Sequence, residues 1–218
     1  MADWATISSL ATAGGTLVLA VATFASVRSA NRSARIAEVA LQEQRRPVLV
    51  QSRLDDPEQK IMFVDRHWVR PPPGGAVLEH ENGNVYMAIS LRNVGAGIGV
   101  CLGWTIRGGI QGAGVEHAPE SEFRTQTRDL YVPAGDVGIW QGAIRDPSDA
   151  AYREVVQAIE TRLPLTIELL YSDQVGGQRT ISRFAIVPAV GEETQLRWLL
   201  SVGRHWYLDG ARPQLPDR

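Results

Sequence analysis

The feature that most constrains this chain is a stretch of 24 residues without a charge, Trp4 to Val27, which lies between Asp3 and Arg28. At roughly 1.5 Å per residue, a helix of this length reaches about 36 Å, whereas the hydrocarbon core of a bilayer is about 30 Å thick. The stretch is also longer than most core helices of soluble proteins need. We therefore predict that residues 1–27 form a transmembrane anchor.

Two alternatives to an anchor stay open. The stretch could be a buried helix of a soluble fold, because Ala, Ser, Thr and Gly dilute its strongly apolar residues. It could also be a cleavable signal peptide, with Ala20-Val21-Ala22 as a small-residue cleavage site. The region before the stretch carries Asp3 and no Arg or Lys, which is unusual for a signal peptide. We favour the anchor.

The charges that flank the stretch predict its direction in the membrane. Arg28, Arg32 and Arg35 follow directly after it, while the short tail before it carries only Asp3 and the amino group. Flanks rich in Arg and Lys stay in the cytoplasm. We therefore expect a single-pass protein of the cell membrane whose remaining chain faces the cytoplasm. The only cysteine, Cys101, fits this reducing compartment because it cannot form an intrachain disulfide.

Residues 28–46 are expected to continue the helix as a juxtamembrane stalk, because they contain no Gly or Pro and stop against Pro47. Within the membrane, one side of the helix carries small residues of the kind that line helix–helix contacts in lipid. These residues are Ser8, Thr12, Thr16, Ala20, Ala11 and Gly15. They make a homo-oligomer possible, although the general abundance of Ala and Thr explains the pattern without one, and we favour that explanation.

Beyond Pro47, short runs of β-forming residues alternate with turn residues. The predicted strands are Val48 to Leu54, Ile61 to Val64, Val85 to Asn93, Ile98 to Arg107, Val137 to Trp140, Leu165 to Tyr171 and Thr180 to Val187. The predicted turns are Pro71 to Gly75, Glu81 to Asn84, Pro133 to Gly135 and Gly176-Gly177. This spacing predicts that residues 47–218 form a mainly β domain, an antiparallel immunoglobulin-like sandwich.

One helix is inserted into this pattern, from Ser148 to Arg162, and it is opened by Asp146-Pro147-Ser148. Its apolar residues gather on one side, so we expect it to cover an open edge or end of the sandwich. The tail from Gln195 to Asp209 is apolar enough to pack, but its periodicity suits either a strand or a helix. We predict a strand there.

Several motifs are spread along the chain after the anchor. They are Arg46-Pro47-Val48 at the end of an Ala/Arg-rich helix, Leu91 to Gly97, Tyr171-Ser172-Asp173 before Gly176, and the closing His205 to Asp209. Together they resemble uncharacterised single-pass membrane-anchored β-sandwich proteins of actinobacteria. The resemblance covers most of the chain and implies the same architecture, but that group has no assigned activity that could be carried over.

The most conspicuous local motif is the glycine-rich segment from Asn93 to Gly99, which follows a predicted strand and invites comparison with nucleotide-binding loops. The next residues, Val100 to Ile106, form another β run rather than a helix whose N-terminus could hold phosphate. We therefore predict a turn or bulge between two strands, with glycines at positions that require positive φ.

The remaining reactive side chains show no pattern of a cofactor or metal site. Cys101 lies inside an apolar run and is expected to pack in the core. Asp55-Asp56 is predicted to be a turn rather than a pair of catalytic carboxylates. The four histidines are scattered without metal-binding spacing: His67, His80, His117 and His205. We predict no cofactor and no metal.

The net charge of the β domain also limits the functions that it can have. The total is −2, Asp3 contributes −1 and residues 28–46 contribute +3, so residues 47–218 carry −4. A mildly acidic domain without a basic stripe is a poor binder of nucleic acid. The leading hypothesis is a non-enzymatic interaction or scaffold module that contacts the lipid bilayer and another membrane or cytoplasmic protein. The alternatives are an enzyme built from loops 67–84 and 108–130, or an extracytoplasmic ligand-binding receptor domain.

Overall fold

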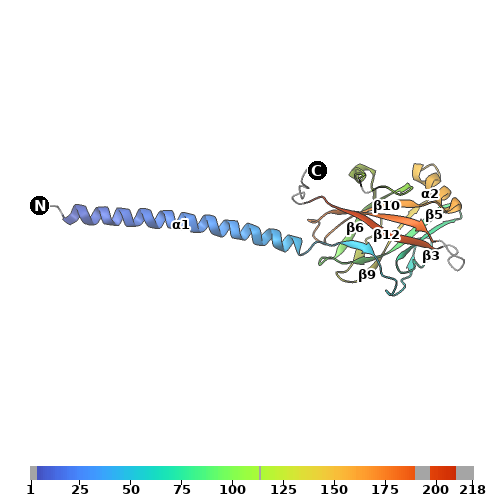
Figure 1. Ribbon diagram of the computed structural model, residues 1–218, viewed down its shortest axis with the longest axis horizontal. Coiled ribbons are helices and arrows are strands. Elements are labelled where there is room, and N and C mark those ends of the chain that lie inside the picture. The colour runs from blue at the N-terminus through green and yellow to red at the C-terminus, as the bar shows by residue number, and fades with distance from the viewer. Residues whose placement is uncertain (1–3, 113, 190–196, 210–218) are drawn as a thin grey trace. The chain divides into compact units, whose positions relative to one another are not determined.

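The computed structural model describes residues 4–112, 114–189 and 197–209, with side chains from residue 12 onward (Figure 1). The chain divides into two compact units, Met1–Glu43 and Gln44–Arg218. The first unit is helical and the second is mainly antiparallel β sheet.

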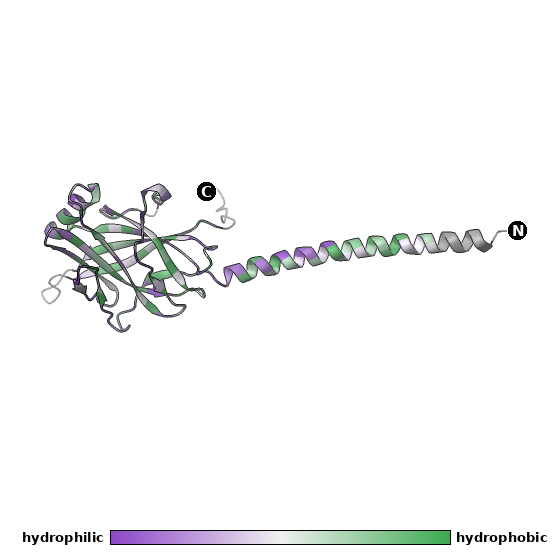
Figure 2. Ribbon diagram, turned by 180° about the vertical axis from the view of Figure 1, so that it is seen from behind, coloured by the Kyte–Doolittle hydropathy of each residue, from purple (hydrophilic) through white to green (hydrophobic). Residues whose placement is uncertain are grey.

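The first unit is helix α1 (Trp4–Glu43). Its segment from Thr12 to Glu43 is long and apolar enough to cross a membrane, and all of it is exposed. Figure 2 shows mainly apolar residues in the middle of α1 and hydrophilic residues interspersed along its C-terminal part. Such a helix is compatible with a single membrane span, and a signal sequence has the same length and composition.

Hydroxyl groups in α1 form hydrogen bonds within the helix. Thr16 Oγ1 donates to the carbonyl oxygen of Thr12 over 2.9 Å, and Thr23 Oγ1 donates to that of Leu19 over 2.8 Å. These bonds lower the cost of placing the hydroxyls in lipid, where no water would receive them. The predicted contact face remains a prediction: its described members Thr12, Gly15, Thr16 and Ala20 are exposed, while the side chains of Ser8 and Ala11 lie outside the described residues.

The predicted end of the stalk at Arg46 is wrong, because α1 ends at Glu43 and a turn follows at Gln44 and Arg45. Arg46 belongs to the β domain instead. Its guanidinium is buried, lies 4.4 Å over the ring of Tyr207, and donates to the carbonyl oxygen of Asp209 over 3.3 Å. These contacts tie Arg46 to the β domain.

The second unit contains twelve strands within its described residues. They are β1 (Leu49–Gln51), β2 (Ile61–Met62), β3 (Trp68–Val69), β4 (Gly75–Glu81), β5 (Asn84–Asn93), β6 (Gly99–Gly108), β7 (Arg124–Thr125), β8 (Tyr131–Val132), β9 (Val137–Ile144), β10 (Leu165–Ser172), β11 (Thr180–Pro188) and β12 (Trp198–Tyr207). The helices are η1 (Glu120–Glu122) and α2 (Ala150–Thr161).

Ten of these strands form one antiparallel sheet in the order β1-β5-β4-β12-β11-β10-β6-β7, with β8 paired to β6 and β9 paired to β5. Strands β2 and β3 pair only with each other. The mainly β fold is confirmed, and the finer prediction of an immunoglobulin-like sandwich is not. All described strands except β2 and β3 belong to one continuous sheet, whereas a sandwich consists of two packed sheets.

The sheet folds back on itself around one large core. Trp140 of β9 meets Trp104 of β6 edge to face, with ring centroids 5.3 Å apart, although β9 and β6 are not paired. At Gly142, a Cβ atom would lie 2.6 Å from the Trp140 ring, so glycine leaves the space that the indole fills. Helix α2 packs on this core through its buried face, Ala151, Tyr152, Val155 and Ala158.

Each predicted strand coincides with an observed one, but several boundaries differ. Strand β1 is shorter than predicted, and β9 continues to Ile144 beyond the predicted end at Trp140. Strands β3, β4, β7 and β8 were not predicted. The tail is a strand in its described part, as predicted. Helix α2 begins at Ala150 because Asp149 caps it, accepting a hydrogen bond from the Ala151 N–H.

The glycine-rich segment after β5 is a turn, as predicted, but the predicted reason is wrong. Gly95 and Gly97 do not have positive φ. Instead, a Cβ atom on Gly97 would lie 1.6 Å from the carbonyl oxygen of Arg45, and one on Gly95 would lie 2.3 Å from that of Arg46. The glycines therefore let two backbone segments touch. Buried Asn93 holds this contact, because its Oδ1 accepts hydrogen bonds from the N–H groups of Val48 and Gly95.

Candidate functional site

The candidate site is organised by the β2–β3 hairpin, which packs on the face of β5 that points away from the main core. Phe63 and Val69 of the hairpin form a second small core with Tyr86 and Ala88. The hairpin turn is closed by the N–H of Phe63, which donates to the carbonyl oxygen of His67 over 2.8 Å. This closure places His67 at the end of the turn, beside β4.

Asp65 fixes the turn of the hairpin to the sheet. Its Oδ2 accepts hydrogen bonds from the hydroxyl of Tyr86 over 2.7 Å and from Arg145 over 3.2 Å. The Tyr86 bond is the main cause that keeps the pKa of Asp65 below its ordinary value, and Arg145 adds to it. The ring of Tyr86 also stacks on the imidazole of His67, with centroids 4.1 Å apart and an interplanar angle of 18°. Asp65, Tyr86 and His67 are thus held as one unit.

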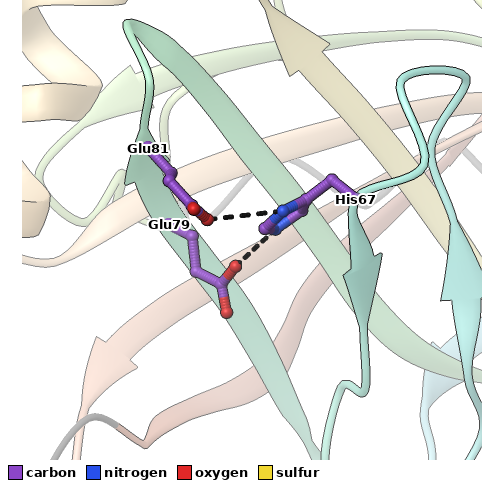
Figure 3. Close-up of side chains that lie close together, drawn as sticks. All are labelled: His67, Glu79 and Glu81. Atoms are coloured by element: carbon purple, nitrogen blue, oxygen red, sulfur yellow. Dashed lines mark hydrogen bonds and ion pairs between the residues drawn. The ribbon is translucent and has the colours of Figure 1, made fainter.

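His67 faces two glutamates of β4 (Figure 3). Glu79 and Glu81 are two residues apart on one strand and therefore project from the same face. His67 Nε2 lies 2.7 Å from Glu79 Oε2, and His67 Nδ1 lies 3.4 Å from Glu81 Oε2. One ligand atom from each of the three residues lies within 4.8 Å of the others, which is a spacing that can hold a metal ion. The prediction that the histidines form no metal-binding pattern did not anticipate this cluster.

On the other side of the hairpin turn lies a half-open cleft of about 710 Å³. Met62, Phe63 and Val64 form its hairpin wall, and Trp104 lines it from β6. Its remaining lining residues are Arg124, Thr125, Gln126, Thr127, Arg128, Gln141, Gly142, Ala143 and Arg145. The described ionisable residues of the lining are therefore all arginines.

The three arginines differ in their partners. Arg124 is bound by Asp149 at both carboxylate oxygens, with Nη2 2.7 Å from Oδ1, and its guanidinium lies 5.0 Å over the Trp104 ring. Arg145 pairs with Asp65. Arg128 is exposed, and its Nη1 donates to the carbonyl oxygen of Met62 over 3.1 Å, a neutral partner. Arg128 therefore brings a positive charge to the cleft that no described carboxylate offsets.

Gln141 adds an acceptor to the cleft wall. Its side chain is only 7% exposed, and its Oε1 has no hydrogen-bond partner among the described residues. A buried amide oxygen without a partner costs free energy of about 1–3 kcal/mol. Because the oxygen itself is buried, this cost falls on the fold and does not mark a ligand position.

Loop 108–130, one half of the predicted alternative enzyme site, is held by a buried ion pair. Arg183 lies 2.6 Å from Glu168, and both side chains are about 5% exposed. Arg183 also donates to the backbone carbonyl oxygens of Gly112, Val115 and Glu116. These charges therefore stabilise the loop and are withdrawn from solvent.

Three other reactive groups are also enclosed. Ser182 Oγ lies 2.6 Å from His205 Nδ1, the spacing of a nucleophile and its base, but Ser182 has no exposed surface that a substrate could reach. Cys101 is buried as predicted, and burial raises the pKa of its thiol to about 12. Asp56 accepts from Arg92 and from the N–H of Arg53, so it closes a turn, as predicted.

The predicted membrane-flanking residues Arg28, Arg32 and Arg35 are exposed on α1. Comparison of the chain with protein-family models, with curated proteins and with solved structures finds no match. Function is therefore inferred from the residues of the cleft and of the anchor.

Proposed function

We propose that this protein is a membrane-anchored interaction module whose β domain binds an acidic segment of another protein in the arginine-lined cleft. The observation that carries the proposal is the composition of the cleft: its described ionisable lining consists of Arg124, Arg128 and Arg145 beside an apolar hairpin wall. Arginine is the side chain best suited to hold carboxylates, because its planar guanidinium offers several donors in a fixed geometry.

The same composition favours binding over catalysis. An arginine side chain keeps its proton at every physiological pH, so it serves poorly as a general acid or base. The described lining of the cleft supplies no carboxylate, imidazole or thiol that could take this role. Segment 108–130, one half of the alternative enzyme site, is tied to the sheet by the buried Arg183–Glu168 pair.

A peptide segment suits the cleft better than a small anion. The volume of about 710 Å³ is within the range of pockets that enclose several residues or a drug-sized ligand. Arg128 would hold a carboxylate, and the exposed apolar side chains of Met62 and Val64 would contact apolar side chains of the segment. The occupant would thus be an acidic and partly apolar stretch of chain.

The anchor would hold this module at the membrane and on its cytoplasmic side, which the positions of Arg28, Arg32 and Arg35 support. We also propose that the strands have an immunoglobulin-like arrangement. The same proposal includes kinship with the membrane-anchored β-sandwich proteins of actinobacteria. An extracytoplasmic receptor is the second candidate, since an apolar N-terminal helix also suits a signal sequence.

Binding is tested with the full-length protein in nanodiscs and a fluorescent Glu-rich peptide, with the same peptide rich in Gln as a neutral control. Replacing Arg128 with Gln removes a charge-assisted contact worth about 1.5–3 kcal/mol, so affinity for the Glu-rich peptide should fall about tenfold or more. The matched control is Arg153→Gln on the exposed face of α2, which should bind as the unaltered protein does. Equal affinity for the neutral peptide would contradict the proposal.

Orientation is tested with a thiol at Gln157, which is exposed on α2. In a Cys101→Ala background, the Gln157→Cys protein should resist a membrane-impermeant maleimide in intact cells and react after permeabilisation. Labelling in sealed cells would place the domain outside and would favour the receptor. Release of the full-length protein by alkaline carbonate would contradict the anchor itself.

A further inference from the structure

We propose that His67, Glu79 and Glu81 form a binding site for a divalent transition-metal ion, for which Zn²⁺ is the best fit. The three donors are one imidazole nitrogen and one oxygen from each carboxylate, all within 4.8 Å of one another (Figure 3). In a tetrahedral zinc site, bond lengths of about 2.0–2.2 Å put neighbouring ligand atoms about 3.3 Å apart. The separation of His67 Nδ1 and Glu81 Oε2 is 3.4 Å.

The glutamates can complete this geometry by rotating their side chains. Glu79 and Glu81 are 45% and 56% exposed, so neither is held by packing. The 2.7 Å contact between His67 Nε2 and Glu79 Oε2 is a hydrogen bond, which would open so that Glu79 could bind the ion. Water would fill the position that faces solvent.

Charge and donor type indicate the kind of ion. Two carboxylates bring a charge of −2, and within the described chain neither Glu79 nor Glu81 forms an ion pair with an arginine or lysine. A divalent cation would balance this charge. Ca²⁺ and Mg²⁺ prefer sites made of oxygen alone, whereas an imidazole donor favours ions such as Zn²⁺.

The imidazole is positioned independently of any ion. Its ring is stacked on Tyr86, and the Tyr86 hydroxyl is bound to Asp65 in the same turn. Glu79 and Glu81 lie on β4, where they pair with Tyr86 and Asn84 of β5. Ligands carried by ordered elements lose little freedom when the ion arrives.

Bound metal would join the hairpin turn to β4. The same hairpin supplies Met62, Phe63 and Val64 to one wall of the arginine-lined cleft. The ion would therefore stiffen that wall, although the metal site itself does not depend on the function proposed for the cleft.

The test is isothermal titration of Zn²⁺ and of Mg²⁺ into the full-length protein in nanodiscs, without a polyhistidine tag. We expect one Zn²⁺ per chain, much weaker binding of Mg²⁺, and a rise in Tm with Zn²⁺ concentration, because an ion that binds only the folded state stabilises it. Glu81→Gln should weaken Zn²⁺ binding at least tenfold and remove the rise in Tm. Because the Glu81 side chain is 56% exposed and His67 is its ion-pair partner among the described residues, we expect this variant to keep the fold.

The matched control is Glu160→Gln, which changes an exposed glutamate of α2 and should leave Zn²⁺ binding unaltered. A second readout is hydrogen exchange: Zn²⁺ should slow exchange of the amides of residues 63–69 and leave α2 unchanged. Zn²⁺ affinity that is the same in Glu81→Gln and in the unaltered protein would overturn the proposal, and so would equal affinity for Mg²⁺.

Discussion

Arg183 and Arg128 carry the same group in the same β domain, but their surroundings are opposite. Arg183 is buried, and its guanidinium is bound to Glu168 and to three backbone carbonyl oxygens. Arg128 is exposed at the cleft, and its described partner is one neutral carbonyl oxygen, that of Met62. The N–H donors of Arg183 are therefore occupied within the fold, whereas Arg128 has N–H donors that a ligand can accept from.

This difference separates charges that stabilise the domain from charges that are available for recognition. A buried charge must have partners because its desolvation is costly, and removing a partner is more damaging than replacing the whole pair. An exposed charge contributes little to stability, so folding does not require it at a given position and it can serve ligand binding there. Variants at the two kinds of site should therefore give opposite results in stability and binding assays.

The largest effect is expected at the buried pair. Glu168→Gln leaves the charge of Arg183 buried without its carboxylate, which should lower the free energy of unfolding by about 3–5 kcal/mol. Urea unfolding followed by circular dichroism measures this loss. Glu122→Gln is the control, because Glu122 pairs with Arg107 at the surface and its removal should cost about 1 kcal/mol or less. Similar losses of unfolding free energy in both variants would contradict the claim that the buried charge stabilises the fold more than the exposed one.

A smaller loss is expected where two backbone segments touch. Gly97→Ala would place a Cβ atom against the carbonyl oxygen of Arg45, so the chain must shift, at a cost of about 1–3 kcal/mol. Gly112→Ala is the control, since a Cβ atom there meets nothing within 4 Å and the φ of Gly112 is not positive. A Gly97→Ala protein as stable as the control would show that close approach does not explain this glycine.

The Asp56–Arg92 pair is expected to give a pH-dependent effect. Hydrogen bonds from Arg92 and then from the N–H of Arg53 lower the pKa of Asp56 from 3.8 to about 2. Because the folded pKa lies below the unfolded one, the stabilisation is present above about pH 4 and is lost as the pH falls toward 2. The stability difference between Asp56→Asn and the unaltered protein should therefore be constant from pH 7 to 5 and shrink below pH 4. A difference that does not change with pH would contradict the ionic origin.

The smallest effect is expected at the cleft. Arg128→Gln should change the free energy of unfolding by no more than about 0.5 kcal/mol, because Arg128 is exposed and has no described carboxylate partner. The measurement is again urea unfolding. A loss as large as that at Glu168 would mean that Arg128 supports the fold and is not reserved for a ligand.

The sequence predicted the elements that local patterns specify. The long uncharged stretch predicted α1, and runs of β-forming residues predicted β5, β6, β10 and β11 within one residue at each end. The short strands β3, β7 and β8 were missed because two residues carry no periodicity. Strand β4 was missed because Glu79, His80 and Glu81 make its sequence look polar, although it pairs with both β5 and β12.

The sites were less predictable, because they depend on contacts between distant residues. His67 meets Glu79 and Glu81 only through pairing of β4 and β5 and packing of the hairpin. Two glutamates at alternate positions of one strand were the available signal. The cleft joins residues from the hairpin, from β6, β7 and β9, and from residues 126–128, and no motif in the sequence connects these segments.

The central claim, recognition of acidic chain by the cleft, is tested most directly by reversing charge on both sides. Affinities are measured for the unaltered protein and for Arg128→Glu, each with a Glu-rich and a Lys-rich peptide of the same length. The unaltered protein should prefer the Glu-rich peptide, and Arg128→Glu should lose at least tenfold in affinity for it while gaining affinity for the Lys-rich peptide. Peptide preferences that are the same in both proteins would contradict the claim.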